Sequence, residues 1–313
     1  MYNIRAAAVL FVYKKTGIDV VSIPESVYPE KLVQSHLKTF RCPICHQGYI
    51  SLIGNTLVCE KGHTIDFNRH GYLHFLNTQG TTEYDRAMFL SRRRLLEAGL
   101  FKPIIKKVNS LLPTTSQTIL DVGTGEGTPL AQLAALRHDQ DFYVGFDISK
   151  AGITLATQLG INAFFCVADL RQLPFADQSF DTVLELFSPS DYREFNRVLK
   201  AGGLLMKVIP NADYLLELRH LLYGDRDQHY HYDNSKVLKL FKQHYPDAEQ
   251  VPIRYQFNLP HELVTDMIKM TPMSWGKNVR QPTKDELANL TSITVDVSLL
   301  VAKKVIKGIA NSI

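Results

Sequence analysis

This sequence contains few tryptophan and cysteine residues and carries little net charge. Its 313 residues include one tryptophan and four cysteines, and the formal net charge is +4. So few cysteines exclude a disulfide-stabilised scaffold and indicate a reducing compartment, so we expect a cytoplasmic protein. The mild positive charge permits an acidic partner without requiring one. No apolar run approaches the length of a membrane span, and we expect no membrane partner.

The first 38 residues carry no motif, and we expect residues 1–38 to form an N-terminal extension. The apolar stretch from Ala6 to Tyr13 is short, is followed by Lys14 and Lys15, and lacks a small-residue cleavage site, so it is not expected to be a signal peptide. Alternating apolar residues from Val9 to Val21 are compatible with strands or with a loose tail.

Three of the four cysteines form a regular pattern with a histidine. Cys42 and Cys45 have the Cys-x2-Cys spacing, and Cys59 and His63 follow with the Cys-x3-His spacing of a tetrahedral zinc site. The intervening residues 49–57 predict a hairpin. The pattern therefore predicts a zinc ribbon, and the alternative is a chance grouping of unrelated cysteines with a histidine.

This predicted zinc-ribbon domain covers residues 39–80. A segment so short has little core, so metal binding must supply much of its folding free energy. Four protein ligands leave no open coordination position, which favours a structural metal over a catalytic one. His46 lies next to Cys45 and competes with His63 as a ligand, but the spacing favours His63.

A glycine-rich stretch follows an apolar run in the middle of the chain. The run ends in Asp121, and Gly123, Gly125 and Gly127 follow at alternate positions before a helical pattern begins. Glycine permits positive φ and close approach of a ligand to the backbone, and the amides that open a helix bind anions or hydroxyls. The spacing differs from the G-x-G-x-x-G of dinucleotide-binding folds, which makes a pyrophosphate cradle the weaker interpretation.

Two further acids follow apolar segments that predict buried strands. Asp147 ends the segment that starts at Phe142, and an acid at the tip of the second strand suits a ribose with two free hydroxyls. Asp169 follows the next segment and could reach an adenine amino group. Residues 251–258 and 293–302 fit the last two strands, as an antiparallel pair at one sheet edge. The series predicts an α/β fold.

A cationic segment precedes the glycine-rich stretch. Residues 86–107 hold seven lysines or arginines and one acid, Glu97. We expect a helix at about 85–98 and another leading to Leu112, which together form a basic helical connector, residues 81–112. Seven clustered cations could hold several phosphates, and the alternative is a solvated helix face.

The segment 186–191 follows the fourth predicted strand of the α/β fold, where such folds place substrate-facing residues. Asp191 is our candidate general base, and the alternative is a helix N-cap. The aromatic rings of Phe187 and Trp275 could stack on a nucleobase, and the alternative for Trp275 is packing in the core. The pair formed by His229 and His231 invites a metal interpretation, but a solvent-facing loop is favoured because no acid or cysteine spacing supports a metal site.

These motifs in this order resemble the class I S-adenosylmethionine-dependent methyltransferases, and the ribbon with the arginine-rich helix resembles the 23S ribosomal RNA (guanine-N1)-methyltransferases, a family that includes macrolide-resistance enzymes. The resemblance is carried by the ribbon pattern, the glycine-rich stretch, Asp147-x-Ser149-Lys150, Leu173-Pro174-Phe175 and Met270-Thr271-Pro272-x-x-Trp275. It implies a Rossmann-like domain at 113–313 with a mostly parallel seven-stranded sheet, preceded by the zinc ribbon.

The resemblance also implies roles for individual residues. Zinc would be held by Cys42, Cys45, Cys59 and His63. S-adenosylmethionine would be bound by Phe101, Asp121, Gly123, Gly125, Glu126, Gly127, Asp147, Asp169 and Tyr214. Phe101 stands where the family can present a tyrosine, and Tyr214 stands where some members have histidine. The implied partner is a hairpin loop in domain II of 23S rRNA, whose guanine N1 is methylated, and a homodimer is a further expectation.

Two other functions share parts of this pattern. A zinc-ribbon RNA-binding protein could bind S-adenosylmethionine as a sensor without turnover. A methyltransferase for a small molecule, a quinone or another RNA would share the catalytic domain, but a small substrate needs neither the ribbon nor the basic helix.

Overall fold

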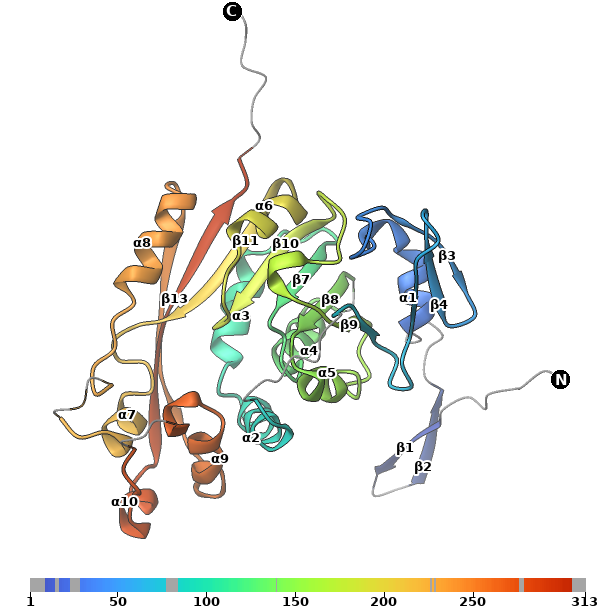
Figure 1. Cartoon of the computed structure of the whole chain (residues 1–313). Helices are drawn as coiled ribbons and strands as arrows, with labels where there is room; N and C mark the ends of the chain where they lie inside the picture. The colour runs from blue at the N-terminus through green and yellow to red at the C-terminus, as the bar shows by residue number, and fades with distance from the viewer. Residues whose placement is uncertain are drawn as a thin grey trace, which may run out of the picture.

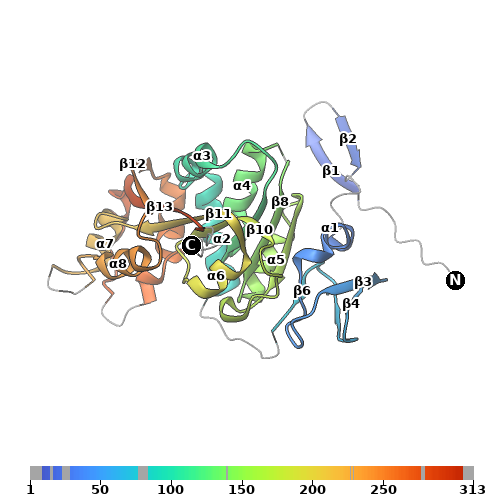
Figure 2. The ribbon, with the colours of Figure 1, turned by 90° about the horizontal axis from the view of Figure 1, so that it is seen from above.

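The computed structural model describes residues 9–14, 17–22, 29–76, 84–138, 140–225, 227, 229–275 and 279–305. A large central sheet carries helices on both faces, and a small three-stranded unit lies beside the β8–β9 side of that sheet (Figures 1 and 2). None of the helices in the described part of the chain has the length and apolar content needed to span a bilayer.

The central sheet has eight strands in the order β12-β13-β11-β10-β7-β8-β9-β6. Their bounds are β6 (Leu73–His74), β7 (Thr118–Val122), β8 (Phe142–Asp147), β9 (Ala163–Val167), β10 (Phe180–Leu186), β11 (Leu199–Pro210), β12 (Glu249–Asn258) and β13 (Ser292–Lys303). The strands from β6 to β11 pair in parallel, whereas β13 runs antiparallel to both β11 and β12. The predicted α/β fold and the antiparallel edge pair are confirmed.

Residues 113–313 supply the seven expected strands, β7 to β13, and the described sheet has one more strand from outside that range. The additional strand, β6, is only two residues long, and it pairs in parallel with Cys166 and Val167 of β9. It lies in the segment predicted to belong to the zinc ribbon. Two residues have no periodicity that a sequence pattern could detect, so only the tertiary contact with β9 defines this strand.

The inner strands β7 to β10 are buried on both faces, as expected of parallel strands with helices on each side. One face packs against α2 (Arg86–Glu97), α3 (Lys102–Leu111), α4 (Thr128–Leu136), α5 (Lys150–Ala156), α7 (Leu216–Leu222) and α9 (Val264–Lys269). The other face packs against α1 (Pro29–Ser35), α6 (Tyr192–Val198), α8 (Ser235–His244) and the small sheet. The short α10 (Lys284–Ala288) precedes β13.

Local signals in the sequence explain where several helices begin. The carboxylate of Asp85 accepts a hydrogen bond from the Met88 amide at 2.7 Å and caps α2. Ser149 caps α5 in the same way, and Thr283 with Glu286 forms a capping box at α10. The helices expected at about 85–98 and up to Leu112 are confirmed as α2 and α3.

The small sheet consists of β3 (Tyr49–Ile53), β4 (Thr56–Cys59) and β5 (Thr64–Asp66), all antiparallel. The predicted hairpin is confirmed as β3 and β4. Before them, β1 (Val9–Lys14) and β2 (Gly17–Ser22) form an antiparallel hairpin, so this alternating stretch forms strands and not a loose tail. The segment from α1 to His36 packs on the central sheet, where the His36 ring stacks on Phe142 at 3.7 Å.

Candidate active site and metal centre

Four side chains of the small sheet converge at one point. The ligand atoms of Cys42, Cys45, Cys59 and His63 all lie within 4.8 Å of one another. The Cys45 and Cys59 Sγ atoms are 3.6 Å apart, and His63 Nδ1 lies 3.6 Å from Cys42 Sγ and 3.5 Å from Cys59 Sγ. Zinc bond lengths imply edges of about 3.8 Å between sulfurs and about 3.6 Å between sulfur and nitrogen in a tetrahedral site. The cluster therefore fits a tetrahedral zinc ion.

Two other metal interpretations raised by the sequence, His46 as a ligand and the pair of His229 and His231, receive no support among the described residues. His46 has a positive φ of 61° and does not join the cluster. Within the residues that the structure describes, this is the only grouping of side chains able to hold a metal. His229 instead pairs with Asp227 at 2.8 Å and stacks on Tyr223, as a loop residue does.

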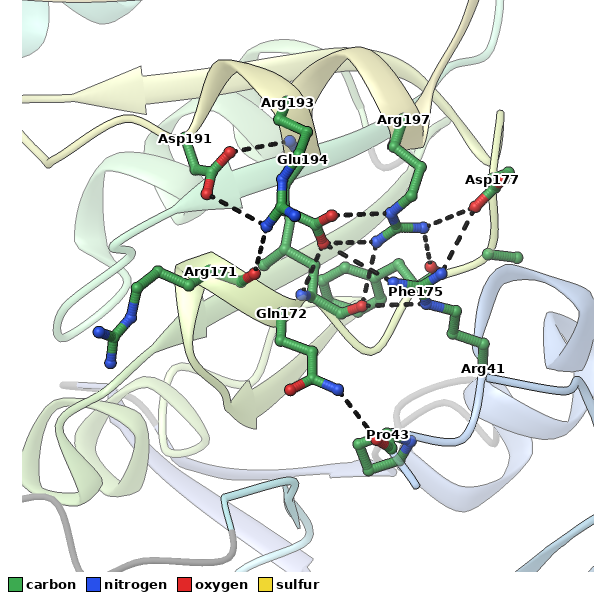
Figure 3. Close-up of polar contacts among 12 residues, drawn as sticks. Arg41, Pro43, Arg171, Gln172, Phe175, Asp177, Asp191, Arg193, Glu194 and Arg197 are labelled. Atoms are coloured by element: carbon green, nitrogen blue, oxygen red, sulfur yellow. Dashed lines mark hydrogen bonds and ion pairs between the residues drawn. The ribbon is translucent and has the colours of Figure 1, made fainter. Parts of the chain in front are cut away.

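The zinc-binding unit is docked on the central domain through an arginine (Figure 3). Arg41, next to Cys42, inserts its guanidinium between Asp177 and Glu194, with its nitrogens at 3.6 and 3.8 Å from their carboxylates. Glu194 also pairs with Arg197 at 2.7 Å. Burial would raise the pKa of Glu194, but the hydrogen bond from Arg197 holds that pKa below its usual range. No local sequence pattern signals this contact, because it joins residues far apart in the chain.

The glycine-rich stretch forms the turn between β7 and α4. Gly123, Gly125 and Gly127 all have positive φ, at 66°, 57° and 83°. At Gly125, a Cβ atom would lie 3.1 Å from the Phe89 ring on α2, so the backbone here is closely covered. Asp121 is buried at the end of β7, and burial raises its pKa to about 7.

Asp147 lies at the end of β8 and connects two turns. Its carboxylate accepts hydrogen bonds from the Gly125 amide at 2.9 Å and from the Ser149 amide at 2.8 Å. Each carboxylate oxygen can accept a further bond, so the side chain can still bind hydroxyl groups. Asp169 follows β9, where its carboxylate accepts from the Arg171 amide and pairs with the Arg171 guanidinium at 2.8 Å.

Glu126 is completely buried and ties the glycine turn to α2. Its Oε2 atom accepts a hydrogen bond from Arg93 at 3.1 Å and another from the Thr128 hydroxyl. Arg93 also donates to the Glu126 and Leu155 carbonyls at 2.9 and 3.0 Å. The Oε1 atom of Glu126 is buried with no hydrogen-bond partner among the described residues, which suits an acceptor for a bound ligand.

The expectation that the arginines of this helix serve as a phosphate-binding surface is wrong for two of them. Arg93 is held by Glu126, and Arg94 pairs with Asp266 on α9. Phe89, Arg92 and Arg93 have the i, i+3, i+4 spacing that places side chains on one helix face. That face covers the glycine turn. Lys102 and Lys106, on α3, are exposed and remain available to an anionic partner.

Three aromatic rings from separate segments meet beside this turn. The Phe187 ring lies 5.1 Å from that of Phe101 and 5.2 Å from that of Tyr214, measured between centroids. Phe187 has a positive φ of 62°, an uncommon conformation for a bulky residue and one that often marks functional sites. The sequence pointed to all three residues individually, but only the fold shows that they form one cluster.

The segment after β10 is held by a buried ion pair that the sequence did not reveal. Glu185 and Lys207 are both buried and in contact, and Ser190 lies 2.9 Å from the Lys207 ammonium. Burial raises the pKa of Glu185, and the Lys207 charge opposes this rise. Ser188 donates to the Val122 carbonyl at 2.6 Å, which fixes the segment against the glycine turn.

Asp191 caps α6 through a hydrogen bond from the Glu194 amide at 3.0 Å. Its use as a helix cap is the alternative expected from the sequence, and its role as a base stays a prediction.

Trp275 is 40% exposed and meets the exposed ring of Tyr84 edge to face, with centroids 5.2 Å apart. Trp275 therefore lies at the surface and not in the core.

Comparisons with known proteins match both parts of this architecture. Residues 40–81 match the model described as "RlmA, N-terminal", a zinc ribbon, and residues 113–246 match the model "Methyltransferase domain". The protein YxjB of Bacillus subtilis, whose name assigns it provisionally to the 23S rRNA (guanine-N(1)-)-methyltransferases, is 37% identical over 274 residues. That alignment covers 85% of this chain and 97% of YxjB.

A second relative has the same coverage. The 23S rRNA (guanine(748)-N(1))-methyltransferase of Streptomyces fradiae is 26% identical over 276 residues, with 85% of this chain and 97% of that protein aligned. A protein of Micromonospora griseorubida with a similar name is 27% identical over 291 residues, covering 85% of this chain and 97% of its own length. This chain therefore belongs to the family of S-adenosylmethionine-dependent 23S rRNA (guanine-N1)-methyltransferases, with a structural zinc ion in its ribbon.

Proposed function

We propose that this chain methylates N1 of a guanine in a hairpin loop of domain II of 23S rRNA. The observation that carries the proposal is that one molecule combines a cofactor-binding turn with an RNA-type zinc ribbon. A glycine turn with an acid at the tip of the next strand suits an adenosyl cofactor, and a zinc ribbon of the type found in rRNA methyltransferases is docked on the same sheet.

The cofactor residues are proposed on this basis. Asp147 binds the ribose hydroxyls, because its oxygens keep acceptor capacity after binding two amides. Glu126 faces the methionine end with its unpartnered Oε1 atom, together with Gly125. Asp169 binds the adenine amino group, and Phe101 and Tyr214 pack against the ligand. The turn itself is shaped by Asp121, Gly123 and Gly127, and zinc is held by Cys42, Cys45, Cys59 and His63.

The bound cofactor supplies an electrophilic methyl group on a sulfonium. The chain supplies position and charge for an in-line displacement. Guanine N1 carries a proton, so a base must remove it or a donor must stabilise O6. A looped-out guanine can stack on an aromatic ring while its Watson–Crick edge is read, and the exposed pair of Tyr84 and Trp275 offers such rings.

Asp191 stays our candidate base, and one substitution separates this role from capping. Asparagine caps helices about as well as aspartate, so Asp191→Asn should leave the unfolding midpoint unchanged. If Asp191 removes the N1 proton, turnover should fall about 100-fold or more. Unchanged turnover with unchanged stability would assign Asp191 to capping alone.

Primer extension on ribosomal RNA tests the substrate. Methylation of N1 blocks Watson–Crick pairing, so reverse transcriptase should stop at the modified guanine in cells that hold the gene. The stop should disappear from a strain lacking the gene and return with the wild-type gene but not with a Gly125→Asp variant. Unchanged stops throughout 23S rRNA would refute the proposal and favour a small-molecule methyltransferase or a non-catalytic sensor.

Two further expectations, the location of the protein and its oligomeric state, belong to the same proposal. A cytoplasmic location follows from a ribosomal RNA substrate. A homodimer is also proposed, and light scattering tests it by distinguishing the mass of one chain from that of two.

A further inference from the structure

Arg92 on α2 points its charge at the proposed cofactor site. Its guanidinium carbon lies 5.4 Å from the centroid of the Phe101 ring. Burial raises the pKa values of Asp121, Asp147 and Tyr214, and the Arg92 charge opposes the rise at all three. Arg92 thus lies over the Phe101 ring, and its charge acts on three further residues that were assigned to the cofactor.

Arg92 also differs from the two arginines that follow it. Arg93 is held by Glu126, and Arg94 pairs with Asp266. Among the described residues, Arg92 forms no hydrogen bond and no ion pair, although its side chain is half-buried. A half-buried guanidinium has lost part of its hydration, and that loss is usually offset by an anionic partner. The missing partner suggests a ligand that carries a negative group.

The neighbouring residues indicate which anion this is. Phe101 is buried and Tyr214 is half-buried, so Arg92 faces a site lined by rings and not the exposed helix surface that an RNA backbone would contact. In the same glycine turn, Glu126 offers an unpartnered carboxylate oxygen. A cation and an acceptor at one site are together complementary to a zwitterion, which an amino-acid group provides.

We infer that Arg92 binds the α-carboxylate of the methionine part of S-adenosylmethionine, with its guanidinium lying over the Phe101 ring. This inference rests on the proposed function. A guanidinium presents two parallel N–H donors that match the two oxygens of a carboxylate, which a lysine ammonium cannot reproduce. Phe101 would then keep the fork oriented, and this gives a role to the phenylalanine at a position where the family can present a tyrosine.

The test uses the full-length zinc-loaded protein and two nucleosides in titration calorimetry. S-adenosylhomocysteine has the amino-acid carboxylate, whereas 5′-methylthioadenosine has the same adenosyl and thioether groups without it. Arg92→Met should weaken S-adenosylhomocysteine binding by about 10- to 100-fold and leave methylthioadenosine binding within about twofold. Arg92→Lys should recover only part of the loss. Arg86→Met, an exposed site on the same helix, is the matched control and should bind both ligands as the wild type does.

Each other outcome contradicts the assignment. An equal loss for both nucleosides would mean that Arg92 only supports the fold around Phe101. Wild-type affinity for S-adenosylhomocysteine together with weaker binding of an rRNA hairpin would assign Arg92 to an RNA phosphate. A wild-type protein that binds neither nucleoside would overturn the proposed function along with this inference, whereas normal binding by Arg92→Met overturns the inference alone.

Discussion

Individual residues around the glycine turn carry charge that is costly to bury. Asp121 lies at the end of β7 with only 2% of its surface exposed, and burial raises its pKa to about 7. The pKa of such a group in the unfolded chain stays near its usual value of about 4. Folding therefore disfavours the ionised form, so this residue makes stability fall as pH rises from about 4 through about 7.

Asp121→Asn should remove this pH dependence. The variant should gain stability relative to the wild type as pH rises, by about 2–3 kcal/mol more at pH 8 than at pH 5, because only the wild type must ionise a buried carboxyl group. Urea unfolding of both proteins without cofactor at the two pH values measures the difference. A gap that stays constant or narrows with rising pH would show that Asp121 is not the group responsible.

Gly125 is predicted to be essential for the cofactor. In Gly125→Asp the added Cβ atom would lie 3.1 Å from the Phe89 ring, at a φ of 57°, so affinity for S-adenosylhomocysteine should fall at least tenfold. Gly160→Asp is the control, since Gly160 has a φ of 65° but no atom within 4 Å of its added Cβ. Calorimetry should show normal affinity for the control, and an equal loss in both variants would indicate backbone strain alone.

At the scale of elements, α2 is a cover for the glycine turn and not a free RNA-binding rod. Phe89 packs over Gly125, and Arg93 reaches Glu126 and the Leu155 carbonyl of α5. The hydrophobic spacing of the helix is apparent from the sequence. The sequence does not show what its arginines contact, because the same pattern results whether a buried acid or solvent lies opposite them.

Removing Arg93 should destabilise the protein strongly. Arg93→Met leaves the completely buried Glu126 carboxylate without its cation, and such losses cost about 3–5 kcal/mol. Adding Glu126→Gln removes the unpaired charge, so the double variant should be more stable than Arg93→Met. Urea unfolding measures the four proteins of this cycle, and losses that simply add would contradict a coupling between the two residues.

At the scale of the whole molecule, the ribbon and the catalytic sheet share one core. Phe40, Tyr49 and Leu57 of the ribbon region belong to the same buried cluster as Phe164 and Phe175 of the central domain. The strand β6 extends the catalytic sheet, and Arg41 is fixed between Asp177 and Glu194. The ribbon therefore holds a set position relative to the proposed methyl-transfer site.

Loss of zinc should consequently destabilise the whole protein and not the ribbon alone. Metal binding supplies folding free energy to a ribbon. Because the ribbon and the sheet share one core, removing the metal should lower the stability of the sheet as well. In guanidinium, zinc release to a colorimetric chelator and the fluorescence change of Trp275, the single tryptophan, should follow one transition. Zinc release well before the Trp275 change would show that the ribbon unfolds independently.

The sequence by itself determined the zinc-binding pattern, the α/β fold and the positions of the glycine turn and its acids. These features are local, because ligand spacing, glycine conformation and apolar periodicity act over a few residues. Only the tertiary structure decided the eighth strand, the docking of Arg41, the internal partners of Arg93 and Arg94, and the ion pair of Glu185 with Lys207. Each of these depends on groups that are distant in the chain, and which charge meets which partner is fixed by packing and burial.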